Sequence, residues 1–148
     1  MPLQLPLKKV FLTQKFGERP DVYRQFGLKG HNGWDFRTRF IDSPLGKMEC
    51  RPISDGKVVS CGFDQGGFGY FCRIQHDDGS QTVYGHFSQL RVKLGHRVNQ
   101  LTVIGITGNT GFSSGPHLHF GYRPPGWEKN ANNGWRGYVD PKIIFPHV

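Results

Sequence analysis

The sequence has 148 residues, a length that buries roughly 70% of the surface of its unfolded chain and so needs no disulfide staples to hold one core together. Apolar residues, with glycine counted among them, are as frequent as in ordinary globular proteins, which excludes disorder over most of the chain. The net charge of +8 favours an anionic partner such as nucleic acid, an acidic membrane surface or a bacterial cell wall, although scattered basic residues also serve solubility alone.

The first six residues, MPLQLP, contain no apolar segment long enough for a signal peptide. Elsewhere no window of the sequence approaches the roughly 20 apolar residues that a membrane-spanning helix needs. We therefore expect no membrane insertion.

Short runs of β-branched and aromatic residues predict strands along the middle and the end of the chain. Turn signals at Asp55-Gly56, Gln65–Gly67 and Asp77–Gly79 separate the first runs at hairpin spacing. No stretch of eleven or more residues keeps the apolar period of a helix, and at most one helical turn is expected, around residues 88–90. The pattern predicts an all-β fold, a compact antiparallel sandwich or barrel of short strands. The expected strands are residues 57–61, 70–74, 81–87, 103–107 and 117–122.

Two segments rich in glycine, proline and asparagine, residues 13–34 and 123–140, have the composition of long loops. Compact domains seldom keep loops of this length without a function, and the rim of a binding groove is the usual one. Nothing indicates an internal repeat or a second domain, so we expect residues 1–148 to form a single domain. The tryptophans lie in or beside these loops, where they stack on a ligand or, more commonly, pack over the edge of a core: Trp34, Trp127 and Trp135.

The cysteines are odd in number and include no C-x-x-C pair, so neither a complete disulfide framework nor a zinc knuckle is expected. Cys61 and Cys72 lie in apolar, strand-like runs, where a free thiol packs as a small hydrophobic group. A Cys50–Cys61 bridge across a hairpin is the less favoured alternative.

The histidines of His117-Leu118-His119 stand two residues apart. On a strand, whose side chains alternate with a period of two, both imidazoles project from one face while Leu118 points to the other. Two imidazoles side by side on a sheet favour a metal site, although the same pattern also arises by chance.

A second segment, HNGWD, places His31 and Asp35 four residues apart, and this even spacing lets both side chains reach one side of an extended chain. Alone, it would indicate a surface loop with an incidental histidine. Two imidazoles and one carboxylate together make three ligands, and zinc then keeps a fourth position open for water, as in catalytic rather than structural sites. Bound zinc brings the pKa of that water down to roughly 7.

His86, in YGHFS, ends a predicted strand, where a lone histidine is more often a hydrogen-bonded structural residue. Its interest comes from the whole set, because histidines beyond the metal ligands would supply acid–base groups near the metal.

HNGWD, YGHFS and TGNTGFSSGPHLHF together resemble, in order and approximate spacing, the signature of the lysostaphin-type (M23) metallopeptidases. The resemblance covers residues 28–122, including the stretch from SDGKV to LTVIG. It implies a compact antiparallel β fold with a metal in a groove between loops. It also implies one zinc ion per chain held by His31, Asp35 and His119, with His86 and His117 as the catalytic pair.

The resemblance further implies a zinc-dependent endopeptidase that hydrolyses peptide bonds in peptidoglycan stem peptides or cross-bridges. Metal-bound water would be the nucleophile and the two histidines would assist, and the identity of the base stays open. We expect a monomer that acts at the bacterial cell wall. Its origin is either a phage, with release by lysis, or a secreted protein whose leader has been trimmed.

The sequence departs from the family pattern in three places. The segment RTRFIDSPLGKMECRPI, after Asp35 and Phe36, is longer than the family norm and would enlarge one wall of the groove. Tyr70 stands where the family usually has asparagine. Some members place a substrate-polarising tyrosine shortly before the first ligand, and Tyr23 is the nearest candidate for this substrate-binding role, although its spacing does not match closely.

Two other classes of function compete with this interpretation. A non-catalytic relative would use the groove as a binding or interaction module, but such relatives typically lose ligands, and all five positions are filled here. A nucleic-acid binder would suit the charge, yet no phosphate loop, helix-turn-helix pattern or basic stripe supports it, so no nucleic acid is expected as a partner. Zinc content distinguishes the first class, and salt-dependent DNA binding distinguishes the second.

Overall fold

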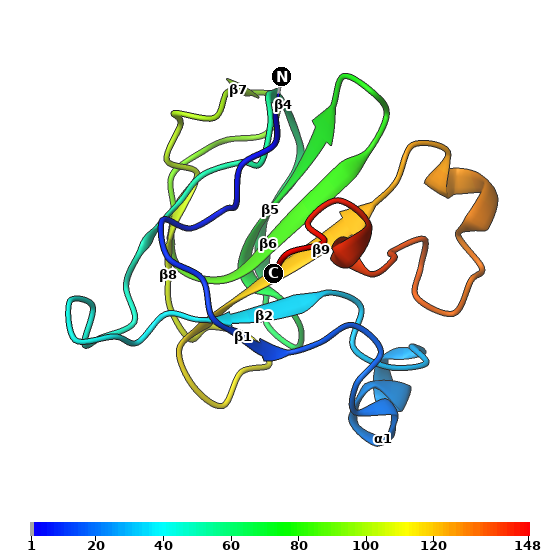
Figure 1. Ribbon diagram of the computed structural model, residues 1–148, viewed down its shortest axis with the longest axis horizontal. Helices are drawn as coiled ribbons and strands as arrows, with labels where there is room; N and C mark the ends of the chain where they lie inside the picture. Colours follow the sequence, from blue (N-terminus) through cyan, green and yellow to red (C-terminus); the bar gives the residue numbers. More distant parts are fainter. Residues whose placement is uncertain (1) are drawn as a thin grey trace.

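A single antiparallel sheet makes up most of the computed structural model, which describes residues 2–148 (Figure 1). Its strands follow one another in space in the order β1–β2–β9–β6–β5–β4–β7, while β8 pairs with both β6 and β3. The fold is therefore all-β and antiparallel, as the sequence predicts. The strands are β1 (Leu12–Gln14), β2 (Trp34–Arg37), β3 (Glu49–Cys50), β4 (Gly56–Asp64), β5 (Gly69–His76), β6 (Gln81–Leu90), β7 (Arg97–Val98), β8 (Gly105–Thr107) and β9 (His117–Arg123).

Short helices occur only in the segments between and after the strands of the described residues. They are α1 (Pro20–Tyr23) and the 3-10 helices η1 (Arg24–Phe26), η2 (Trp127–Asn130) and η3 (Pro141–Ile143). Both loops predicted from composition thus contain a helical turn or two, and in Figure 1 the loop that carries α1 extends away from the sheet. Over residues 2–148, no helix has the length and apolar character needed to cross a membrane.

The predicted helical turn at residues 88–90 is wrong. These residues end β6, where Gln89 and Leu90 pair with Ile106 and Gly105 of β8. Pairing with a distant strand decides the conformation of this segment, and that partner leaves no local sign in the sequence.

The core lies against one face of β2 and β9. Trp34 and Phe36 of β2 alternate with Asp35, and Leu118 and Phe120 of β9 are fully buried on the same side. This alternation sends the residues between them to the opposite face. Trp34, 2% exposed, therefore packs into the core rather than stacking on a ligand.

Strand β6 changes its pairing partner at His86. Residues before it, up to Gly85, pair with β9, and residues after it, from Phe87, pair with β8. His86 itself adopts a left-handed conformation with a φ of 66°. The backbone N–H of His86 donates to the Phe68 carbonyl oxygen at 2.6 Å, which holds this bend in place.

All three cysteines are free thiols, as the sequence predicts. Cys50 and Cys72 belong to the core, and Cys61 on β4 stands directly across from Cys72 on β5.

A buried polar network surrounds His76, which is 5% exposed at the end of β5. Its Nδ1 lies 2.9 Å from both Ser54 Oγ and the Asp55 carbonyl oxygen, and its Nε2 lies 2.8 Å from Thr82 Oγ1. Burial lowers the pKa of His76 below its ordinary value of 6.5. The folded protein therefore takes up a proton at this position at lower pH than the unfolded chain does.

This difference predicts a pH dependence of stability. As pH falls below about 6.5, the unfolded chain binds a proton that folded His76 does not, so His76 lowers the free energy of unfolding by at most about 1.4 kcal/mol per pH unit. The His76→Gln variant lacks this loss. The free energy of unfolding of the wild type, relative to that of the variant, should therefore fall as the pH is lowered from 7.5 to 5. Urea denaturation in the presence of a chelator measures it, with exposed His147→Gln as the control. An advantage that stays constant with pH would contradict the assignment.

Candidate metal centre and groove

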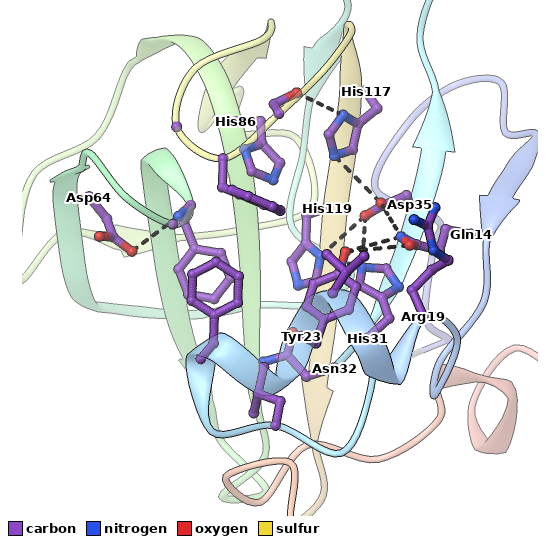
Figure 2. Close-up of a pocket in the computed structure, with 18 of the residues that line it drawn as sticks. Gln14, Arg19, Tyr23, His31, Asn32, Asp35, Asp64, His86, His117 and His119 are labelled. Atoms are coloured by element: carbon purple, nitrogen blue, oxygen red, sulfur yellow. Dashed lines mark hydrogen bonds and ion pairs between the residues drawn. The ribbon is translucent and has the colours of Figure 1, made fainter.

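Three potential metal ligands converge on the face of the sheet opposite the core. Asp35 on β2 and His119 on β9 are direct cross-strand partners, and His31 lies four residues before Asp35. His31 Nε2 lies 3.0 Å from Asp35 Oδ1 and 3.1 Å from His119 Nδ1, and the third side of the triangle measures 3.2 Å. Within residues 2–148 this is the only such cluster of three histidine, cysteine or acidic side chains. Figure 2 shows the three side chains pointing toward one another.

Hydrogen bonds at the back of the cluster select the ring nitrogens that face inward. His31 Nδ1 lies 3.2 Å from the Lys15 carbonyl oxygen, which only accepts, so Nδ1 is the donor there and Nε2 is the nitrogen that faces the cluster. His119 faces the cluster with Nδ1, while its buried Nε2 has no hydrogen-bond partner among the described residues.

The charges of the cluster suit a cation. Burial alone would raise the pKa of Asp35, but hydrogen bonds with His119 and His31 outweigh it and hold the pKa well below its usual range. Burial lowers the pKa of His119. At neutral pH the site therefore contains a carboxylate and a neutral imidazole, the protonation states that metal binding requires.

The triangle also matches the size of a zinc site. Tetrahedral zinc with bonds of about 2.0–2.1 Å places neighbouring ligand atoms roughly 3.3 Å apart. The observed separations of 3.0–3.2 Å are close to that value. His31, Asp35 and His119 thus fit a zinc ion and leave one position for a further ligand.

His86 and His117 lie beside the triangle, with their ring centroids 4.5 Å apart (Figure 2). His86 Nδ1 lies 2.7 Å from the Thr110 carbonyl oxygen, and His117 Nδ1 lies 2.9 Å from the Gly115 carbonyl oxygen. Both carbonyls hold the proton on Nδ1 and leave Nε2 with a lone pair. His117 Nε2 lies 3.6 Å from Asp35 Oδ2.

Burial, with a further contribution from the charge of His117, lowers the pKa of His86 to about 3. His86 is therefore neutral at physiological pH and accepts hydrogen bonds through Nε2.

Interlocked loops hold His86 in place. The Thr110 hydroxyl donates to the Phe87 carbonyl oxygen at 2.6 Å and accepts from the Tyr70 N–H at 3.1 Å. Gly69 and Gly111 both have positive φ, and a side chain on Gly111 would overlap the backbone of Gly69. Glycine is required at this crossing because the two backbones touch.

Tyr23 lies over His31, with ring centroids 5.1 Å apart. Gln14 Nε2 donates to the Tyr23 hydroxyl at 3.0 Å and to Asp35 Oδ2 at 3.3 Å, so one amide links the tyrosine to the carboxylate. Burial raises the pKa of the Tyr23 hydroxyl, and the charge of Asp35 raises it further. Tyr23 is thus a neutral O–H donor facing the cluster.

The five histidine and aspartate residues singled out in the sequence open into one groove of about 650 Å³, and Tyr23 lines it as well. The α1 loop forms one wall, and the segments around Phe68 and Phe112 form the other. The two walls meet where the rings of Phe26 and Phe112 pack edge to face at 5.1 Å. Sequence reasoning missed Gln14, Thr110 and Arg19, which line or support the groove.

Comparison with known proteins identifies relatives of the whole motif-bearing region. The sequence model of Peptidase family M23 matches residues 29–133. The catalytic domain of lysostaphin from Staphylococcus simulans superposes with a TM-score of 0.72 at 26% identity, over 93% of this chain and 92% of that domain.

Two curated relatives have names that state an activity. Glycyl-glycine endopeptidase ALE-1 of Staphylococcus capitis is 39% identical over 97 residues, which make up 64% of this chain. DD-carboxypeptidase/endopeptidase Mpg of Neisseria meningitidis serogroup B is 33% identical over 122 residues, or 78% of this chain. The chain covers only 25% and 28% of the lengths of these two relatives.

The packing beneath the triangle predicts that Gly33 admits no side chain. A Cβ at Gly33 would overlap the Phe120 carbonyl oxygen and lie 2.9 Å from His119 Cε1. Gly33→Ala should therefore displace the His119 ring and lower the free energy of unfolding by about 1–3 kcal/mol. Urea denaturation measures the loss, and a crystal structure shows the ring.

Gly66→Ala is the matched control, because a Cβ there has no neighbour within 4 Å. We expect the control to stay within about 0.5 kcal/mol of the wild type. Equal stability of the two variants would show that the contact beneath His119 is not tight.

Proposed function

The chain belongs to peptidase family M23, and from this premise we propose that it is a zinc-dependent endopeptidase that hydrolyses peptide bonds of peptidoglycan. The observation that carries the proposal is the triangle of His31, Asp35 and His119 beside two histidines with inward lone pairs, all in one groove. The activities named for ALE-1 and Mpg support it.

We propose that His31, Asp35 and His119 hold one zinc ion per chain. Zinc in such a site polarises a peptide carbonyl and lowers the pKa of water. The Asp35 carboxylate offsets part of the ion's charge, and Gln14 holds that carboxylate in place through its amide. The carbonyl of Lys15 does the same for the ring of His31.

In this proposal His86 and His117 handle the protons. Their Nε2 atoms accept hydrogen bonds from the attacking water and orient it, because each Nδ1–H is occupied by a backbone carbonyl. The pair then passes a proton to the leaving amine. Tyr23, a neutral donor at the same cluster, donates a hydrogen bond to the carbonyl oxygen of the substrate as negative charge develops on it.

The proposal also covers the domain organisation, the place of action and the oligomeric state. We propose that residues 1–148 form one peptidase domain, whose groove is bordered by parts of the segments 13–34 and 123–140. Its net charge of +8 suits an anionic wall, and we propose that it acts there as a monomer without a nucleic-acid partner.

Zinc stoichiometry, measured beside chelator-sensitive release of peptides from purified peptidoglycan, tests the proposal. We expect about one zinc per chain and peptide release that stops with chelator and returns with zinc. Zinc binding without hydrolysis would favour the non-catalytic binding module. A protein that binds no zinc and shows no hydrolysis even after zinc is restored would contradict the proposal.

Variants separate the ligands from the proton-handling pair. His119→Ala and Asp35→Ala should lose zinc and activity together. His86→Ala and His117→Ala should keep zinc while kcat falls by roughly 10²–10⁴, the usual contribution of acid–base help. Metal analysis and steady-state kinetics on the same preparations distinguish the two classes. A His86→Ala variant with near-wild-type turnover would remove that residue from the mechanism.

Tyr23→Phe tests the proposed donor. The substitution keeps the ring over His31 and removes only the hydroxyl, so zinc content should not change. Loss of one donor to a developing oxyanion lowers kcat by roughly 10²–10³. An unchanged kcat would leave Tyr23 with a packing role alone.

A further inference from the structure

Three residues of the groove have a strained backbone. Among the described residues, the only ones other than glycine with a positive φ are Arg19, His86 and Arg136, and all three line this groove. A left-handed conformation costs an ordinary residue free energy, so it persists where the surrounding structure or function requires it. The strain at His86 is explained by the change of strand pairing. The two arginines need a separate explanation.

Arg136 has a structural role. Its Nη2 donates a hydrogen bond to the carbonyl oxygen of Phe26, the last residue of η1, and its own carbonyl oxygen accepts from Arg123 Nε at 3.0 Å. These bonds fasten the 123–140 segment to the α1 loop.

The carbonyl oxygen of Arg19 accepts from the N–H groups of Val22 and Tyr23 at 3.0 and 3.2 Å, but its side chain has no comparable role. Arg19 occupies the N-cap of α1 with a φ of 57°, and its side chain makes no capping hydrogen bond. Serine, threonine, aspartate, asparagine and glycine are the residues that suit such a position. Its nearest carboxylate within residues 2–148 is Asp21, at 4.0 Å, and both side chains are largely exposed, so this pair contributes little.

The direction of Arg19 connects it to the site. Arg19 and Tyr23, at the two ends of α1, both line the groove. In the view of Figure 2, Arg19 lies to the right of Tyr23 among the labelled residues of the groove. The other charged side chains of the groove are engaged: Asp35 in the triangle, Asp64 with the Phe68 N–H at 3.1 Å and Arg136 with Phe26.

We infer that Arg19 binds a free carboxylate of the peptide in the groove, so that the substrates of this chain are carboxylate-bearing stem peptides of peptidoglycan rather than uncharged glycine bridges. The guanidinium offers a planar fork of N–H donors that matches a carboxylate with two parallel hydrogen bonds. The inference rests on the proposed function and decides between the two substrate classes that the sequence left open.

The test uses three synthetic probes: a cross-linked stem-peptide dimer with its carboxylates free, the same dimer with every carboxylate amidated, and pentaglycine blocked at both ends as the N-acetyl amide. The wild type should cleave the acidic dimer with a kcat/KM roughly 10–100-fold above that of the amidated dimer, as for a hydrogen bond to a charged group. Arg19→Gln should remove this preference by slowing cleavage of the acidic dimer only. Arg19→Lys, which keeps the charge without the fork, should fall between them.

Arg24→Gln is the matched control, because Arg24 is exposed in the next helical turn and does not line the groove. It should leave all three rates unchanged. Equal cleavage of both dimers, a preference that survives in Arg19→Gln, or preferred cleavage of pentaglycine would overturn the inference and leave the proposed function standing. Cleavage of none of the probes or of purified peptidoglycan would overturn both.

A stability measurement excludes a merely structural role. Asparagine tolerates a positive φ and caps helices well, so Arg19→Asn should raise the melting temperature by about 2–4 °C while it abolishes the preference for the acidic dimer. A lower melting temperature would show that Arg19 holds the loop together, contrary to the inference.

Discussion

The register of β9 between β2 and β6 is the constraint on which the site depends. It sets His119 opposite Asp35 on one side and opposite Gly85 on the other. A slip of one residue would turn the histidines of β9 into the core and bring Leu118 and Phe120 to the groove. Burial of each of these two apolar side chains is worth roughly 1.5–3 kcal/mol, so the core enforces the register that the site needs.

Around that register, backbone groups complete the arrangement. The carbonyls of Lys15, Thr110 and Gly115 each hold one imidazole by its Nδ1, and so determine which nitrogen faces the cluster. The bend at His86 brings its ring beside His117 because β6 leaves β9 for β8 at that residue. The histidines of the candidate site are thus oriented mainly by the main chain, whose positions follow from the sheet.

Sequence patterns predicted the parts of this arrangement that periodicity controls. The alternation in His117-Leu118-His119 was confirmed, with Leu118 in the core and both histidines on the other face. The four longest strands and the short β8 were also predicted, although β4, β5 and β6 extend further than the runs suggested. Strand β2 was not predicted as a strand, since its four residues follow a glycine-rich segment and are ordered by pairing with β9.

Other features lay beyond prediction for physical reasons. A carbonyl acceptor such as that of Thr110 carries no residue signature, because every residue has one. The positive φ of Arg19 could not be predicted either, because arginine is not one of the residues that adopt this conformation readily. Gln14 reaches Asp35 across β1–β2 pairing that bulges between Leu12 and Gln14, an irregularity that no local pattern specifies. The roles of the site residues themselves rest on the family resemblance and on geometry.

The alternation along β9 has an evolutionary consequence. Its inward residues belong to the core and its outward histidines line the groove, so the two sets can change independently. The outward histidines of β9 lie at short range from His31 and the Asp35 carboxylate, and one buried ring nitrogen of this group has no partner within residues 2–148. Proteins commonly trade stability for such groups, and drift at these positions would be tolerated by the sheet. A fold organised in this way can pass from enzyme to inert scaffold by a few substitutions in the groove, while its strands and core remain the same.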